Sequence, residues 1–208
     1  MDPADALLVV DLQLDFMPKG ALAVAGGDEL VAPISALAAR FSTVIATQDW
    51  HPLGHVSFAS HHGRPLFSKL PLYGGEQTMW PDHCVQGTPG AALHAGLDLT
   101  RVNVILRKGA RADVDSYSAF FENVGPDGTR PSTGLAELLR ARGIRRVFVC
   151  GLARDVCVAD TAVDAAAEGF AVTLLDALTR SVDEHSRPRV DSRLKSAGVT
   201  IEAPAVNP

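Results

Sequence analysis

Residues able to carry out nucleophilic catalysis stand just after short apolar runs of the chain. Asp11 follows the run ALLVV, Lys108 follows VNVIL, and Cys157 lies beyond a glycine turn that follows RVFVC. A thiol attacks a carbonyl carbon only as the thiolate, which a cation such as Lys108 and a helix N-terminus would both stabilise. Asp11 could accept the thiol proton and later deliver it to a leaving group. The three residue types together favour nucleophilic catalysis by a cysteine.

Each of these residues also has a simpler structural interpretation. Asp11 could cap a helix, Lys108 could be a surface charge, and Cys157 could be a small core residue. Their joint placement at the ends of three apolar runs favours the catalytic interpretation. The backbone N–H groups of the turn between Gly151 and Cys157 could then hold a developing oxyanion.

A second group of residues has the composition of a metal site. Asp49 and His51 are two positions apart in QDWHP, so an extended backbone points both side chains to one face, and Pro52 favours that extended state. The segment MWPDHCVQGT adds His83 near Trp80. One carboxylate and two imidazoles with open coordination positions suit zinc, iron or manganese.

The remaining histidines and cysteines carry weaker signals. His55, His61 and His62 could be loop residues without a role in metal binding. Three cysteines in a chain without a signal peptide favour free thiols over a disulfide framework. Cys150 lies inside an apolar run and is interpreted as core, whereas Cys84, next to His83, is expected to point away from a metal.

The elements that would position these residues alternate along the chain. Apolar runs at 6–10, 43–47, 102–106, 146–150, 171–176 and 199–203 predict buried strands, and helical patterns cover 29–41, 133–143 and 155–169. Such alternation predicts a three-layer α/β/α fold with a central, mostly parallel six-stranded sheet. Ligands of such sheets bind beyond the carboxyl ends of the strands, where the candidate residues stand. A small irregular insertion around residues 51–90 is expected to be functional or disordered.

Length and composition limit the class of protein. With 208 residues, 47% of them hydrophobic, the chain is expected to form one domain over residues 1–208. The 24 acidic residues outnumber the 19 basic ones, which disfavours a nucleic-acid partner. The sequence contains no apolar run of membrane-spanning length and no signal-peptide pattern, so a cytoplasmic protein with no membrane partner is expected.

Five blocks of the sequence resemble a known family. These blocks are DLQLDF (11–16), QDWHP (48–52), WPDHCVQGT (80–88), KG with DSYSAF (108–109 and 115–120) and GLARDVCV (151–158). They resemble the nicotinamidase and pyrazinamidase branch of the isochorismatase-like cysteine hydrolases, in the expected order. The resemblance implies a catalytic triad of Asp11, Lys108 and Cys157, metal ligands Asp49, His51 and His83, and pocket residues Phe16, Trp80 and Tyr117. It also implies a cis peptide between Leu152 and Ala153, with the amides of Ala153 and Cys157 as the oxyanion hole.

The activity that the resemblance implies is metal-dependent hydrolysis of nicotinamide to nicotinate and ammonia through a cysteine thioester, in NAD salvage. Pyrazinamide would be a second substrate. The cofactor would be one divalent metal ion per chain, zinc before iron or manganese. The remaining coordination position stays open between Ser57, His55 and water. The chain could also form a homo-oligomer.

Other functions stay open at this point. One is an amidase of the same superfamily that acts on carbamoyl or ureido substrates and needs no ring-anchoring metal. A catalytically inactive binding module, or a vinyl ether hydrolase that works without the cysteine, would not need Asp11, Lys108 and Cys157 together. The family often has a small polar residue at the position of Arg154 and an aromatic one at that of Val156, so the pocket rim and the thiolate electrostatics could differ here.

Overall fold

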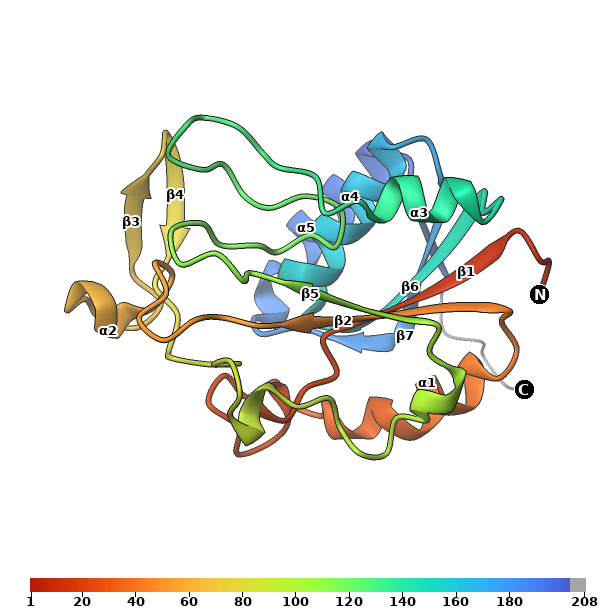
Figure 1. Cartoon of the computed structure of the whole chain (residues 1–208), viewed down its shortest axis with the longest axis horizontal. Coiled ribbons are helices and arrows are strands. Elements are labelled where there is room, and N and C mark those ends of the chain that lie inside the picture. The colour runs from red at the N-terminus through yellow and green to blue at the C-terminus, as the bar shows by residue number, and fades with distance from the viewer. Residues whose placement is uncertain (203–208) are drawn as a thin grey trace.

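A six-stranded sheet forms the centre of the computed structural model, which describes residues 1–202 (Figure 1). The strand order is β5-β2-β1-β6-β7-β8, and every neighbouring pair is parallel. The strands are β1 (Asp5–Val10), β2 (Thr43–Asp49), β5 (Val104–Lys108), β6 (Arg146–Leu152), β7 (Ala171–Arg180) and β8 (Thr200–Glu202). The predicted parallel sheet is confirmed, although β5 begins two residues after the start of the apolar run 102–106, and the last residue of the run 199–203 lies outside the described residues.

Helices cover both faces of the sheet, as predicted for three layers. Helix α1 (Val31–Ala38) packs on one face, and α3 (Leu135–Ala141), α4 (Ala159–Ala167) and α5 (Arg187–Ser196) pack on the other (Figure 1). The central strand β1 contributes to both cores, because Leu7 and Val9 face the α1 side while Leu8 and Val10 face the other. All four side chains are completely buried. Burial on both faces explains why this strand is a continuous apolar run without polar alternation.

Helix α5 is the one long element without a predicted counterpart. Its sequence RPRVDSRLKS buries only Val190 and Leu194. Two apolar positions four residues apart give too weak a periodicity to stand out among charged residues. Helix α5 contacts the turn that carries Cys157, because Asp191 of α5 pairs with Arg154 of that turn.

The insertion around residues 51–90 is more regular than predicted. It contains the short helix α2 (Ala59–His62) and an antiparallel hairpin of β3 (Lys69–Leu72) and β4 (Gly75–Thr78). The hairpin turns at Tyr73 and Gly74, which both have positive φ angles, of 48° and 81°. Each strand is only four residues long and half of its residues are exposed, so both give a weak signal in the sequence.

Short turns complete the chain. Single 3-10 turns occur at Leu14–Phe16, Asp28–Leu30, Pro89–Ala91, Leu99–Arg101 and Glu184–Ser186, and a π-helical turn occupies Arg154–Val158. In the described part of the chain, no helix has the length and apolar character needed to cross a membrane.

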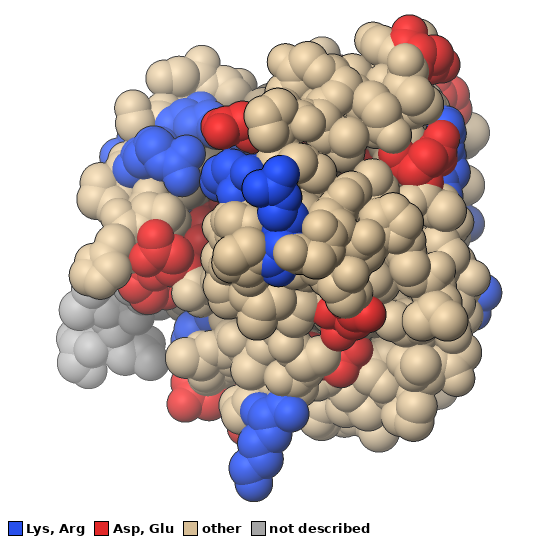
Figure 2. All heavy atoms as spheres, turned by 90° about the vertical axis from the view of Figure 1, so that its left-hand side faces the viewer, with Lys and Arg blue, Asp and Glu red and all other residues tan. Residues whose placement is uncertain are grey.

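The face on the hairpin side of the molecule lies toward the left of Figure 1, where β1 and β2 end. On this face, charged groups of both signs are scattered over a mostly uncharged surface (Figure 2). A surface of this kind does not create a strong field of one sign.

Gly151 allows the closest backbone approach within the sheet. A Cβ atom at this position would lie 2.1 Å from the carbonyl oxygen of Val10 on β1, and the φ angle of Gly151 is +110°. Both facts require glycine, because only glycine lacks the Cβ and adopts such a φ angle readily. The glycine thus lets β6 stay paired with β1 up to the turn that carries Cys157.

Replacing Gly151 with Ala should destabilise the fold by about 3 kcal/mol, because the new methyl group adds a steric clash to the cost of the positive φ angle. Thermal denaturation should show a fall in Tm of about 6–12 °C. Gly169→Ala is the matched control, since Gly169 also has a positive φ angle, +87°, but its Cβ would meet nothing within 4 Å. Equal losses of Tm in both variants would contradict the role given to the close approach.

Candidate active site

The ammonium group of Lys108 lies at the centre of the candidate catalytic group. Its Nζ is 3.0 Å from Asp11 Oδ2, donates to the carbonyl oxygen of Ser116 at 3.0 Å, and lies 3.4 Å from Cys157 Sγ. Lys108 Nζ also donates to Asp49 Oδ1. These residues come from the carboxyl ends of β5, β1 and β2 and from the turn after β6, which are four neighbouring strands. The structure therefore brings together the three residues of the predicted triad.

Asp11 is held in a constrained conformation beside Lys108. Its φ angle is +47°, which is uncommon for a residue other than glycine, and its side chain is completely buried. Thr47 Oγ1 donates to Asp11 Oδ1 at 2.6 Å, and the backbone N–H of Asp11 donates back to Thr47 Oγ1 at 3.1 Å. Burial raises the pKa of Asp11 to about 6, against the opposing effect of the Lys108 ammonium. A carboxyl group with a pKa near neutrality is suited to move protons in both directions.

The thiol of Cys157 is buried beside Lys108. Burial raises the pKa of Cys157 well above its ordinary value, and the Lys108 ammonium, which was expected to stabilise the thiolate, offsets this only in part. The nearby carboxylates of Asp11 and Asp49 raise the pKa further. The resting group is therefore a thiol, and Cys157 becomes a nucleophile only when its proton passes to a base such as Asp11.

The turn that carries Cys157 has the geometry that the resemblance implied. The peptide bond between Leu152 and Ala153 is cis, and the π-helical turn Arg154–Val158 leads directly into α4. The carbonyl oxygen of Ala153 accepts hydrogen bonds from the amides of Val156 and Val158, at 3.1 and 3.0 Å. The turn is thereby closed on itself, with Cys157 at the start of a helix.

A small cavity of about 20 Å³ lies next to Cys157. Its walls include the three aromatic residues predicted from the resemblance, Phe16, Trp80 and Tyr117, together with Asp49, His83 and Ala153. Trp80 Nε1 donates to the hydroxyl oxygen of Tyr117 at 3.2 Å, which fixes the two rings against each other. A volume of this size holds about one water molecule, so the walls must move apart to admit a ring.

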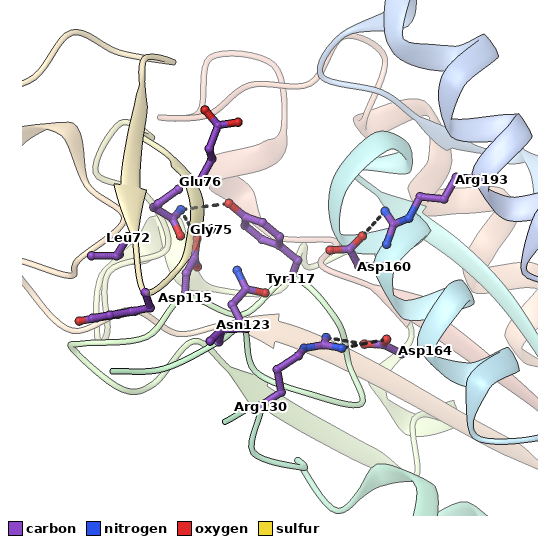
Figure 3. Close-up of a pocket in the computed structure, with 13 residues that line it drawn as sticks. Leu72, Gly75, Glu76, Asp115, Tyr117, Asn123, Arg130, Asp160, Asp164 and Arg193 are labelled. Carbon is purple, nitrogen blue, oxygen red and sulfur yellow. Dashed lines mark hydrogen bonds and ion pairs between the residues drawn. The ribbon is translucent and has the colours of Figure 1, made fainter. Parts of the chain in front are cut away.

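A larger cavity, of about 320 Å³, shares Asp115 and Tyr117 with the small one (Figure 3). Two of its cations are already paired with acidic partners, Arg130 with Asp164 and Arg193 with Asp160. Cys157 lines the small cavity but not this one. The chemistry therefore belongs to the smaller cavity.

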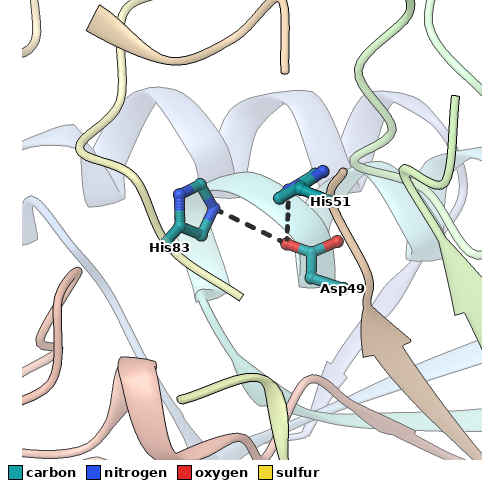
Figure 4. A group of neighbouring side chains, drawn as sticks. All are labelled: Asp49, His51 and His83. Atoms are coloured by element: carbon teal, nitrogen blue, oxygen red, sulfur yellow. Dashed lines mark ion pairs between the residues drawn. The ribbon is translucent and has the colours of Figure 1, made fainter. Parts of the chain in front are cut away.

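The three predicted metal ligands lie together (Figure 4), and two of them, Asp49 and His83, line the small cavity. Asp49 Oδ2 lies 3.6 Å from His51 Nε2 and 3.8 Å from His83 Nε2. The other ring nitrogens are engaged by backbone carbonyls, His51 Nδ1 with Gly109 at 2.9 Å and His83 Nδ1 with Pro81 at 2.7 Å. Both Nε2 atoms therefore face the carboxylate while Nδ1 is held by a backbone carbonyl, which is the arrangement of histidines that bind a metal. The donor set fits a divalent cation.

The ionisable side chains of this group shift one another's pKa values. Burial opposes ionisation of Asp49, but the Lys108 ammonium and His51 outweigh it and hold the pKa of Asp49 below its usual value. Burial and the neighbouring His51 lower the pKa of His83 to about 4. Near neutral pH the site thus presents a carboxylate and a neutral His83, the protonation states that a metal requires.

The open coordination position has two nearby side chains. His55 stacks on His51 with ring centroids 4.2 Å apart, and both of its nitrogens are occupied, Nδ1 by Ser57 Oγ at 2.8 Å and Nε2 by the carbonyl of Val114 at 3.1 Å. His55 could ligate a metal only after giving up one of these contacts. His51, His55 and Asp115 form a second group whose donor atoms lie close together.

Several residues that support the site were not singled out from the sequence. Gln13 Oε1 accepts from the amide of Asp49 at 2.7 Å, and Gln13 Nε2 donates to the carbonyl of Asp49 at 2.8 Å. Thr47 orients Asp11, as described above. Gln77, the only buried residue of β4, donates to Asp115 Oδ2 at 2.7 Å. Gln13 and Asp115 lie inside the blocks DLQLDF and DSYSAF, so the resemblance could have pointed to them, whereas Gln77 carries no local signal.

Comparisons with known proteins show which family the chain resembles. The family model described as isochorismatase domain matches residues 5–202. The nicotinamidase of Acinetobacter baylyi is 49% identical over 166 residues, which are 79% of this chain and 76% of that protein. The nicotinamidase of Escherichia coli is 42% identical over 205 residues, covering 96% of this chain and 94% of that protein.

Solved structures with the same fold are also similar to this chain. A nicotinamidase and pyrazinamidase of Acinetobacter baumanii superposes with a TM-score of 0.91 at 41% identity, over 97% of this chain and 96% of that one. A protein from L. infantum in complex with nicotinate has a TM-score of 0.85 at 45% identity, over 97% and 94% of the two chains. A pyrazinamidase of Pyrococcus horikoshii in complex with zinc has a TM-score of 0.78 at 36% identity, over 96% and 99%.

The pKa of Asp11 predicts how the reactivity of Cys157 depends on pH. Alkylation of Cys157 by iodoacetamide should slow as the pH falls through about 6, because protonated Asp11 can no longer accept the thiol proton. Mass spectrometry of labelled peptides should also show Cys84 and Cys150 reacting more slowly, since both are completely buried and burial raises their pKa values. Equal labelling of all three cysteines would contradict this assignment.

The close approach of the Gly109 backbone to the His51 ring gives a prediction for the candidate metal site. A Cβ at Gly109 would lie 2.4 Å from His51 Cε1, so Gly109→Ala should displace the imidazole and weaken zinc binding by about 10–100-fold. Competition with a chromophoric chelator measures the affinity. Gly128→Ala is the control, because Gly128 also has a positive φ angle but its Cβ would have no neighbour within 4 Å. Unchanged zinc affinity in Gly109→Ala would argue against His51 as a ligand.

Proposed function

The chain belongs to the isochorismatase domain family, and we propose that it is a metal-dependent nicotinamidase that also hydrolyses pyrazinamide. The observation that carries the proposal is the position of Asp49. One of its oxygens contacts the catalytic Lys108, and the other faces the two histidine Nε2 atoms. The nucleophile and a ring-anchoring site are therefore adjacent in one cavity. Relatives named nicotinamidase support the same reaction.

Binding would place a neutral aromatic amide between the aromatic walls. Phe16, Trp80 and Tyr117 would contact the ring, which suits a flat apolar group. Asp49, His51 and His83 would hold a divalent metal ion, which supplies a Lewis acid to bind the ring nitrogen. The neighbouring pyrazinamidase in complex with zinc supports zinc as that ion. A neutral substrate needs no electrostatic steering, in agreement with the mixed charges around the site (Figure 2).

The first half of the reaction would form a thioester. Asp11 takes the thiol proton, and Cys157 Sγ attacks the carboxamide carbon. The amides of Ala153 and Cys157 hold the oxyanion of the tetrahedral intermediate. When this intermediate collapses, Asp11 returns the proton to the leaving nitrogen, and ammonia departs. Since the pKa of Asp11 is about 6, it can both take up and release the proton near neutral pH.

The second half would release the acid. Asp11 accepts a proton from water, the resulting hydroxide attacks the thioester, and Cys157 leaves as a thiol after it regains the proton. Lys108 keeps its charge throughout, because Asp11 and Asp49 overcome the effect of burial and raise the pKa of its ammonium well above the ordinary value. Its role is to orient Asp11 and to stabilise negative charge on sulfur. The products, nicotinate and ammonia, would serve NAD salvage.

A second candidate is an amidase of the same family that acts on carbamoyl or ureido substrates. The same triad could perform that chemistry. The metal group at the wall of the cavity argues against it, because a substrate without a ring nitrogen gives His51 and His83 no task.

The activity assay separates these candidates. Purified protein loaded with zinc should convert nicotinamide to nicotinate and ammonia, and Cys157→Ala should lose at least about 10³-fold in kcat because the nucleophile is gone. Cys150→Ala is the matched control: Cys150 is a buried cysteine on β6 outside the cavity, and its variant should stay active. Chelation should abolish turnover, and added zinc should restore it.

The remaining outcomes each exclude part of the proposal. Full turnover in protein shown by elemental analysis to be free of metal would remove the metal from substrate binding but retain the hydrolase. No turnover of nicotinamide by the zinc-loaded protein, together with turnover of a carbamoyl or ureido compound, would replace the proposed function with the second candidate.

A further inference from the structure

Arg154 combines complete burial with a position at the start of the catalytic turn. It is the first residue of the turn Arg154–Val158 and one of the largest side chains that are completely buried. Its Nε donates to Asp176 Oδ1 at 3.0 Å. Its Nη2 lies 2.9 Å from the same oxygen and 2.8 Å from Asp191 Oδ1. Both contacts are ion pairs, but their angles are not those of hydrogen bonds. One guanidinium thus joins the catalytic turn to β7 and to α5.

Asp176 lies in an irregular part of β7. Val149 of β6 pairs with Leu174, whereas Gly151, two residues further along, pairs with Thr179, five residues further along β7. The extra residues of β7 form a bulge that includes Asp176. Bulges of this kind re-aim a side chain at the cost of regular pairing. Here the bulge coincides with the carboxylate that meets Arg154.

Stability alone is a weak reason for this arrangement. A buried ion pair often contributes no more than apolar side chains of similar volume would, because both charges lose their water. The two carboxylates do fix the direction of the guanidinium, since they approach it from two different elements. The contact is therefore suited to define an orientation.

Asp155 holds the same turn from the same side. Its Oδ1 and Oδ2 accept from the amides of Val182 and Asp183, both at 2.9 Å. Ala153, Val156 and Cys157 line the catalytic cavity instead. Arg154 thus anchors the turn to β7 and α5, and Asp155 anchors it to the segment that follows β7. Ala153 and Val156, on either side of these two residues, line the cavity.

We propose that Arg154 is a positioning residue, which sets the orientation of the turn and so aligns Cys157 and the oxyanion amides with the bound amide. The inference rests on the proposed function, since it concerns the same thiol and amides. Arg154 acts through the turn and contacts Asp176 and Asp191. A misplacement of reacting groups by about 1 Å can cost about 100-fold in rate, so even a small rotation of the turn would matter.

The variant Arg154→Met removes the charge and keeps most of the volume. We expect kcat for nicotinamide to fall about 10–100-fold while KM changes less than about threefold, because ring binding does not involve the turn amides. Iodoacetamide should label Cys157 more slowly than in the wild type, since the thiol moves away from Lys108. Arg154→Lys should recover part of both losses.

Arg146→Met is the control variant. Arg146 lies at the opposite end of β6 and donates two hydrogen bonds to Asp5, at 2.9 and 2.8 Å. It should change Tm without changing kcat. If Arg154→Met behaves like Arg146→Met, with lower Tm but unchanged kcat and labelling, Arg154 is merely structural and the proposal is wrong.

A second variant decides the question if Arg154→Met does not fold. Asp191→Asn removes one ion pair of Nη2 and leaves Asp176 in place, so it should lower kcat several-fold at constant KM; no change in kcat would overturn the proposal. If the wild type does not hydrolyse nicotinamide at all, the proposed function fails. The labelling rate of Cys157 then still tests Arg154, because it needs no substrate.

Discussion

The buried ammonium of Lys108 is the interaction on which the site depends. A charge of this kind loses its hydration on burial, and an unpaired buried ion costs several kcal/mol even after relaxation of the surroundings. Asp11 and Asp49 provide the two carboxylates that stabilise it. The lysine in turn opposes the effect of burial on the pKa of both carboxylates. The three groups therefore stabilise one another, and the loss of any of them would leave uncompensated charge in the core.

The order of the strands sets the distance that the Lys108 side chain must span. Lys108 ends β5 at the edge of the sheet, whereas Cys157 follows β6, which is separated from β5 by β2 and β1. Only a long side chain can reach from one to the other across the carboxyl ends of the intervening strands. Asp49 and Asp11 stand at the ends of those two strands, directly along the path of the lysine. The active site is thus a row of side chains laid across four parallel strands, and each strand contributes one of them.

The sequence revealed this row because each member follows an apolar run, and buried parallel strands are apolar on both faces. It also revealed the histidines, since Asp49 and His51 are spaced for an extended strand. It could not reveal Thr47 or Gln77, whose contacts join residues 36 and 38 positions apart. Helix α5 was missed because it buries only two side chains. The sequence also could not show that the pKa of Cys157 is raised, because the depth of burial depends on packing from the whole chain, and at this site its effect exceeds that of the lysine.

Asp49 belongs to both halves of the site, which limits what its substitution can show. One oxygen contacts Lys108 and the other faces the histidines, so its removal would disturb the nucleophile and the metal group together. His83 offers a cleaner separation. Its ring nitrogens face only Asp49 and the carbonyl of Pro81 among the described polar contacts. Of the two imidazoles that face Asp49, His51 is the nearer, and the carboxylate outweighs burial and raises its pKa, whereas the pKa of His83 is lowered to about 4. The candidate catalytic group and the candidate metal ligands therefore form one electrostatic unit, in which one oxygen of Asp49 contacts Lys108 and the other faces the two histidines.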